Sequence, residues 1–88
     1  MTWVIEFDNK AKKELAALSE GAARRITAFL HERVLDGPRS VGESLKGSRL
    51  GSLWKYRVGD NRIIASIEDS ALRILVVRVG NRKNVYQG

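Results

Sequence analysis

The stretch LWKYRVGDNRIIASIEDSALRILVVRV, residues 53–79, decides the fold. It contains three apolar runs, which are Leu53–Val58, Arg62–Ile67 and Leu72–Val79. Gly59-Asp60 separates the first two runs and is typical of a hairpin turn, and Glu68-Asp69-Ser70 separates the last two. The last run consists almost entirely of β-branched residues and leucine, which favour strands. The stretch therefore predicts a three-stranded antiparallel meander.

Upstream of residue 53, the sequence predicts one strand and two helices. Alternating apolar residues at Trp3, Ile5 and Phe7 indicate a strand with one buried face. Asp8 or Asn9 can cap the first helix. Two apolar stripes at helical spacing follow, formed by Ala11, Leu15 and Leu18 and then by Ala22, Ile26, Phe29, Leu30 and Val34. We expect a turn near Ser19–Gly21, a helix end at Asp36-Gly37-Pro38, and a loop over residues 39–51.

This order of elements predicts an α+β fold: an N-terminal strand, two helices, and the antiparallel meander, with both helices packed on one face of the sheet. The length of 88 residues fits one domain, residues 1–88, with a small core.

Composition excludes several classes of protein. The chain has no cysteine, which rules out disulfides, a cysteine zinc site and a thiol nucleophile. The first residues lack the order of a signal peptide, and no apolar run is long enough to span a membrane. We expect a soluble cytoplasmic protein without metal or cofactor. The single histidine, His31, is predicted to lie on the solvated surface of the second helix.

The positive charge is concentrated in one half of the chain. Residues 1–44 contain seven Lys/Arg and seven Asp/Glu, whereas residues 45–88 contain nine and three, which accounts for the net charge of +6. An excess confined to one half suggests a basic surface for an anionic partner, and nucleic acid is the leading candidate.

Strand geometry places part of this charge on one surface. With a two-residue turn at Gly59-Asp60, Arg57 lies directly opposite Arg62, and Lys55 lies on the same face. The apolar side chains point to the other face, toward the helices: Trp54, Tyr56, Val58, Ile63, Ala65 and Ile67. Two interpretations stay open: the cationic side chains cover the sheet with their charged ends in water, or a phosphate ligand relieves their repulsion.

The segments that carry these residues resemble the RelE family of toxins, in the RelE/ParE superfamily of toxin–antitoxin systems. The similar blocks are Leu45-Lys46-Gly47, Leu53–Asp60, Arg62-Ile63-Ile64, Val76–Arg82 and Val85-Tyr86. The resemblance covers nearly the whole chain. It implies a RelE-like fold and a metal-independent endoribonuclease that cleaves mRNA in the ribosomal A site.

Carried over position by position, the family's functional residues fall on Lys55, Arg57, Arg62, Arg82 and Tyr86. Arg62 and Arg82 are expected to hold phosphate oxygens. Crowding by the arginines is expected to lower the pKa of Lys55, so that it can act as a base. Tyr86 is expected to stack on a base or to position the nucleophile. Contacts with RNA or the ribosome are expected from Lys46, Arg49 and Lys83. Asn61 and Asn81 depart from residues common in relatives.

The resemblance also implies partners: a RelB-like antitoxin, the ribosome with its mRNA, operator DNA through the antitoxin complex alone, and no membrane. Two rival functions stay open. One is a ParE-like poison of DNA gyrase, and the other is an inactive antitoxin-binding co-repressor.

Overall fold

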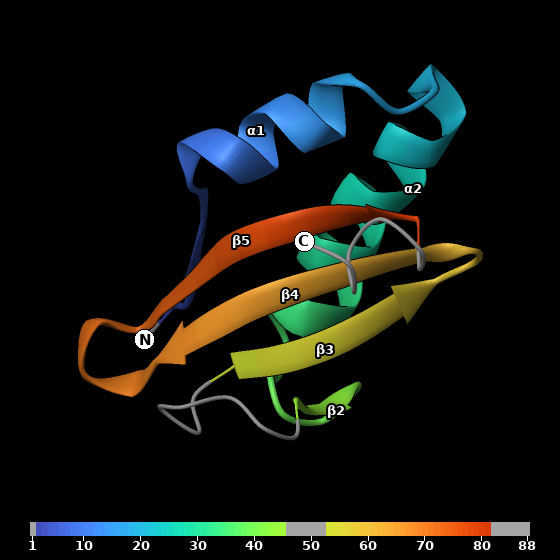
Figure 1. Cartoon of the computed structure of the whole chain (residues 1–88). Helices are drawn as coiled ribbons and strands as arrows, with labels where there is room; N and C mark the ends of the chain where they lie inside the picture. The colour runs from blue at the N-terminus through green and yellow to red at the C-terminus, as the bar shows by residue number, and fades with distance from the viewer. Residues whose placement is uncertain (1, 46–52, 82–88) are drawn as a thin grey trace.

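A five-stranded mixed sheet with both helices on one face forms the framework of the protein (Figure 1). The computed structural model describes residues 2–45 and 53–81. The helices are α1 (Asn9–Ala16) and α2 (Glu20–Phe29). Across the sheet, the strands run β1 (Val4–Phe7), β5 (Arg73–Asn81), β4 (Asn61–Glu68), β3 (Leu53–Val58) and β2 (Glu43–Ser44). The expected α+β class and the placement of the helices are confirmed.

The predicted meander is formed by β3, β4 and β5, with antiparallel pairing throughout. Val58 pairs with Asn61, so Gly59-Asp60 is the two-residue turn, and Gly59 adopts the positive φ of 61° that a type II′ turn requires at its first central position. The predicted start of the last strand at Leu72 is wrong. Leu72 has a left-handed φ of 49° and its N–H donates to the Asp69 carbonyl at 3.2 Å, so it closes the turn and the strand begins at Arg73.

The N-terminal strand lies parallel to the last strand, with Val4 beside Arg73 and Phe7 beside Val76. A parallel pair needs a long crossover connection, and here α1 and α2 belong to that connection. β5 is consequently an internal strand, although it comes last among the strands of the described chain.

Side-chain caps begin both helices. The Asp8 carboxylate accepts from Ala11 N at 2.8 Å, and the Ser19 hydroxyl accepts from Ala22 N at 3.2 Å. The turn expected near Ser19–Gly21 is therefore shorter than predicted, because Ser19 already caps α2. The second helix also differs: after Phe29 it widens into a π-helical segment, Leu30–Val34, in which Leu35 N donates to Leu30 O at 3.0 Å.

The core lies between the helices and the sheet. Tyr56 is fully buried, its ring meets the Phe29 ring edge-on at 6.0 Å, and its hydroxyl donates to the Pro38 carbonyl at 2.6 Å. Trp54 packs against the same core and donates from Nε1 to the Val41 carbonyl at 2.8 Å. The prediction that these two aromatic residues belong to the core is confirmed.

The loop predicted over residues 39–51 is wrong in part, because Glu43–Ser44 forms the short strand β2 beside β3. Gly42 permits this approach. It has a φ of 73°, and a side chain on it would overlap the Lys55 carbonyl oxygen and the Tyr56 ring. None of the helices in the described ranges is long and apolar enough to cross a membrane.

Candidate functional site

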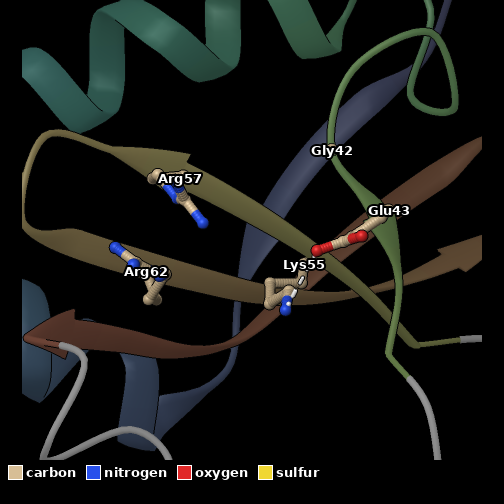
Figure 2. A pocket seen from close by; sticks show the side chains of 5 residues that line it. All are labelled: Gly42, Glu43, Lys55, Arg57 and Arg62. Atoms are coloured by element: carbon tan, nitrogen blue, oxygen red, sulfur yellow. Dashed lines mark ion pairs between the residues drawn. The ribbon is translucent and has the colours of Figure 1, made fainter.

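Three cationic side chains meet in a pocket on the face of the sheet away from the helices. Lys55, Arg57 and Arg62 line it together with Gly42 and Glu43, and its volume is about 240 Å³ (Figure 2). Pockets that enclose a whole small molecule usually measure about 300–1,000 Å³. The size and the charge of this pocket therefore suit a single anionic group.

The two arginines come from facing positions on adjacent strands. Arg57 on β3 pairs directly with Arg62 on β4, as the hairpin register predicted. Arg62 is only 8% exposed, and on its other side it pairs with Gly80 of β5, which has no side chain to compete for space. A guanidinium in this position is held by the sheet and faces a second positive charge.

Within residues 2–45 and 53–81, no carboxylate forms an ion pair with Arg57 or Arg62. Arg62 donates one long hydrogen bond, from NH1 to the Asn61 carbonyl at 3.3 Å. Buried cations are normally paired, because burial removes their hydration. This pair of arginines therefore has unused capacity to bind an anion.

Unlike the two arginines, Lys55 forms an ion pair with an acidic residue of the described chain, Glu43. Its Nζ lies 3.1 Å from Oε1 of Glu43, and the two residues are register partners across β2 and β3 (Figure 2). Glu43 was not among the predicted site residues. Glu43 lies in a segment that the sequence predicted as a loop. Without a predicted strand there, its pairing with Lys55 could not be foreseen.

Two other cations in the described part of the second half, Arg73 and Arg78, are also paired with carboxylates. Arg73 forms ion pairs with Glu6 at 2.9 Å and with Glu68 at 2.7 Å, and Arg78 forms one with Glu14 at 3.1 Å. Arg73 and Arg78 therefore add little to the expected basic surface, and its full extent stays a prediction because Lys46, Arg49, Arg82 and Lys83 lie outside the described ranges. In the described part of this half, the cations that line the pocket are Lys55, Arg57 and Arg62.

The remaining predicted site residues lie outside the described ranges: Arg82, Tyr86, Lys46, Arg49 and Lys83. His31 is exposed on the π-helical segment and bonds through Nδ1 to the Thr27 carbonyl at 2.9 Å, which confirms its surface position. Among residues 2–45 and 53–81, no group of three His, Asp or Glu side chains is arranged to hold a metal ion.

Chemically, the pocket can bind one phosphate group. Two planar guanidinium groups can donate several hydrogen bonds to its oxygens, and the Lys55 ammonium adds a third positive charge. A five-stranded mixed sheet with two helices on one face and a cationic pocket on the other describes a class of small α+β proteins.

Comparisons with known proteins identify the family to which the chain belongs. The family model described as the ParE toxin of type II toxin–antitoxin systems matches residues 5–86. The toxin RelE of Mycobacterium tuberculosis is 27% identical over 77 residues, which is 88% of this chain and 78% of that relative.

Two solved structures from E. coli are also similar. One is an arginine-to-alanine mutant of the toxin RelE in the free state, with a TM-score of 0.82, 25% identity, and coverage of 99% of this chain and 93% of that one. The other is the intact RelBE toxin–antitoxin complex, with a TM-score of 0.78, 25% identity, and coverage of 90% and 95%.

The chain therefore belongs to the ParE toxin family of type II toxin–antitoxin systems. Within the RelE/ParE superfamily it is a toxin of the RelE type.

Proposed function

We propose that this toxin is an mRNA interferase, a metal-independent endoribonuclease that cleaves mRNA in the ribosomal A site and so stops translation in the cytoplasm. The observation that carries the proposal is the pairing of Arg57 with the buried Arg62 in one pocket, where no described carboxylate neutralises either of them. A gyrase poison has no evident need for a phosphate-sized cationic pocket on the open face of its sheet.

The chemistry follows from what the pocket offers. In metal-free RNA cleavage, the 2′-oxygen attacks the adjacent phosphorus, and negative charge grows on the phosphate oxygens. Arg57 and Arg62 stabilise that charge by donating hydrogen bonds to the oxygens. Arg82 and Tyr86, assigned by resemblance to the family, supply a further guanidinium and an aromatic ring that stacks on a base or positions the nucleophile.

The ionisable side chains of this site are weak acids and bases. Orientation of the RNA must therefore supply much of the rate enhancement. The ribosome provides that orientation in the proposal, and Lys46, Arg49 and Lys83 contact RNA phosphates. The whole activity resides in one domain, residues 1–88.

A RelB-like antitoxin is the proposed inhibitor, in line with the RelBE complex that resembles this chain. The cationic pocket suits a partner that brings an acidic segment, and a segment that folds on binding could cover the sheet. Contact with operator DNA is proposed only through the antitoxin.

A toeprinting assay tests the function. Purified toxin is added to ribosomes programmed with a defined mRNA, and cleavage in the A site is mapped by primer extension. We expect cleavage by the wild type and loss of at least about 100-fold in rate for Arg62→Ala, Arg82→Ala and Tyr86→Ala. The matched control is Arg25→Ala, which removes the same charge from the exposed surface of α2.

Circular dichroism melting of each variant separates lost chemistry from lost folding. Cleavage by Arg62→Ala at the wild-type rate would contradict the proposed site. Gyrase-dependent DNA breaks without RNA cleavage would favour the ParE-like alternative, and inactivity in both assays would favour the co-repressor.

A further inference from the structure

Glu43 is the acidic residue of the pocket, and the roles assigned so far do not use it. We propose that Glu43 is a catalytic residue: its carboxylate accepts the proton of the attacking 2′-hydroxyl, with Lys55 as its positively charged neighbour. This inference rests on the proposed RNA cleavage and deepens it, because it names the group that recognises ribose rather than deoxyribose.

The fold fixes the position of Glu43 through its neighbours in the chain. The Val41 carbonyl accepts a hydrogen bond from Trp54 Nε1 at 2.8 Å, which ties this segment to β3. Gly42 then packs so closely that a Cβ would lie 2.7 Å from the Tyr56 ring. The pairing of Glu43 with Lys55 brings its side chain to the same sheet face as Arg57 and Arg62.

Binding alone does not explain a carboxylate at this point. A negative charge beside three cations weakens the attraction of the pocket for a phosphate, by simple Coulomb repulsion. A pocket whose role was only to bind an anion would bind it more tightly with a neutral residue in place of Glu43. The carboxylate is better suited to a step in which a proton must be accepted.

Ordinary acid–base chemistry favours Glu43 over Lys55 for this step. A free glutamate has a pKa of about 4.3 and a free lysine one of about 10.4, so at neutral pH a carboxylate has lone pairs ready to accept a proton and an ammonium has none. The Lys55 ammonium lies 3.1 Å from the Glu43 carboxylate and forms an ion pair with it. Lys55 in this role holds the carboxylate and attracts the phosphate.

The proton of the 2′-hydroxyl moves to a carboxylate oxygen of Glu43, and the O2′–P bond forms. The P–O5′ bond breaks, the leaving 5′-oxygen takes a proton from water, and the products are a 2′,3′-cyclic phosphate and a 5′-hydroxyl. Deoxyribose has no 2′-hydroxyl, so DNA has no proton for Glu43 to accept at this position. The negative carboxylate then only repels the DNA phosphate.

The test compares Glu43→Gln with the wild type in two measurements on the programmed ribosome. The first is the single-turnover cleavage rate at saturating toxin. The second is toxin affinity for ribosomes whose mRNA carries one 2′-deoxynucleotide at the cleavage position. We expect the rate to fall by at least about 100-fold, the scale of general base catalysis, while the affinity stays equal or becomes several-fold tighter.

The matched control is Glu32→Gln, which makes the same charge change at an exposed position on the π-helical segment and should change neither quantity. Glu43→Asp keeps a carboxylate and should retain more activity than Glu43→Gln. Equal or faster cleavage by Glu43→Gln would overturn the proposal, as would a parallel loss of rate and affinity. RNA left intact by the wild type and by Glu32→Gln would instead overturn the proposed function, and the role of Glu43 with it.

Discussion

At the scale of single residues, Arg57 and Arg62 show a conflict between stability and binding. Facing positions on paired strands bring side chains close together, and like charges there are destabilising. Arg57 is exposed, whereas Arg62 is 8% exposed. The fold therefore tolerates a repulsion that an anionic ligand would relieve.

Replacing Arg57 by threonine should stabilise the free protein. Arg57→Thr removes the repulsion and keeps a residue that favours strands, so we expect the free energy of unfolding to rise by roughly 0.5 kcal/mol. Urea denaturation at low and high salt measures the gain, which should shrink as salt screens the wild-type repulsion. A lower stability for Arg57→Thr at low salt would show that the two arginines do not repel each other appreciably.

Tyr56 illustrates the opposite case, a polar group whose burial is fully compensated. Its hydroxyl donates to the Pro38 carbonyl inside the core, and burial raises the pKa of Tyr56 well above its usual range. The neutral phenol is therefore the form that the folded state requires. The nearby Arg39 lowers the pKa of Tyr56, but this effect is smaller than that of burial.

The raised pKa of Tyr56 makes the free energy of unfolding depend on pH in the alkaline range. Above about pH 10 an unfolded tyrosine ionises while Tyr56 stays protonated, so the unfolded state releases the proton and the folded state loses stability as pH rises. Tyr56→Phe should lack this contribution to the alkaline loss and should cost about 1–2 kcal/mol at neutral pH, because the Pro38 carbonyl loses its donor. Urea unfolding from pH 8 to 11 tests this expectation, and parallel pH curves for both proteins would contradict it.

At the scale of elements, Glu14 joins α1 to the last strand. β1 ends beside Val76, so beyond that residue β5 lacks β1 as a partner on this side. The Glu14 carboxylate accepts from Val79 N at 2.9 Å and pairs with Arg78 at 3.1 Å. A β-bulge between β4 and β5 lies opposite Ile64/Ala65, next to this contact. The Glu14 side chain of α1 thus supplies an acceptor for the Val79 N–H at a point where β5 has no β1 partner.

We expect Glu14→Ala to lower the free energy of unfolding by about 2–3 kcal/mol, because it leaves a partly buried guanidinium and a backbone N–H without their acceptor. Glu20→Ala is the comparison: Glu20 forms an exposed pair with Arg24, with side chains 87% and 73% exposed, and should cost less than about 0.5 kcal/mol. Chemical denaturation of both variants gives the two values. Equal costs would mean that the Glu14 contacts contribute no more than a surface ion pair.

The elements also show what the sequence could predict. The hairpin register followed from period-two alternation and a two-residue glycine turn, and those local signals fixed the pairing of Arg57 with Arg62. β2 could not be predicted, because two residues are too few to show a period and its pairing depends on the close approach at Gly42. Glu43 was missed for that reason. The parallel neighbour of β1 depends on contacts far apart in the chain, which local patterns do not encode.

At the scale of the whole molecule, charge distribution matters more than net charge. The chain carries a formal charge of +6, yet Arg39, Arg73 and Arg78 are engaged by carboxylates. On the pocket face, Arg57 and Arg62 have no carboxylate partner among the described residues, so their charges are available to attract an anion. In the proposed function, association with a ribosome should be steered by that face.

Salt dependence of binding should report on this arrangement. We expect toxin affinity for ribosomes to fall steeply with salt, and the slope of log affinity against log salt to become shallower by about 1 for Arg62→Ala, as for one lost phosphate contact. Arg25→Ala removes a charge from the helical face and should leave the slope unchanged. A salt titration of binding to non-cleavable programmed ribosomes measures both slopes, and identical changes would mean that net charge alone governs binding.

The parallel neighbour of the N-terminal strand has a consequence for biosynthesis. Glu6 and Arg73, joined by an ion pair at 2.9 Å, lie 67 positions apart in the sequence. During translation β1 is made early and must wait for β5 before it can pair, so the sheet closes only after residues 73–81 have been synthesised. In the proposed function, the toxin therefore cannot cleave mRNA on a ribosome before residues 73–81 have been synthesised.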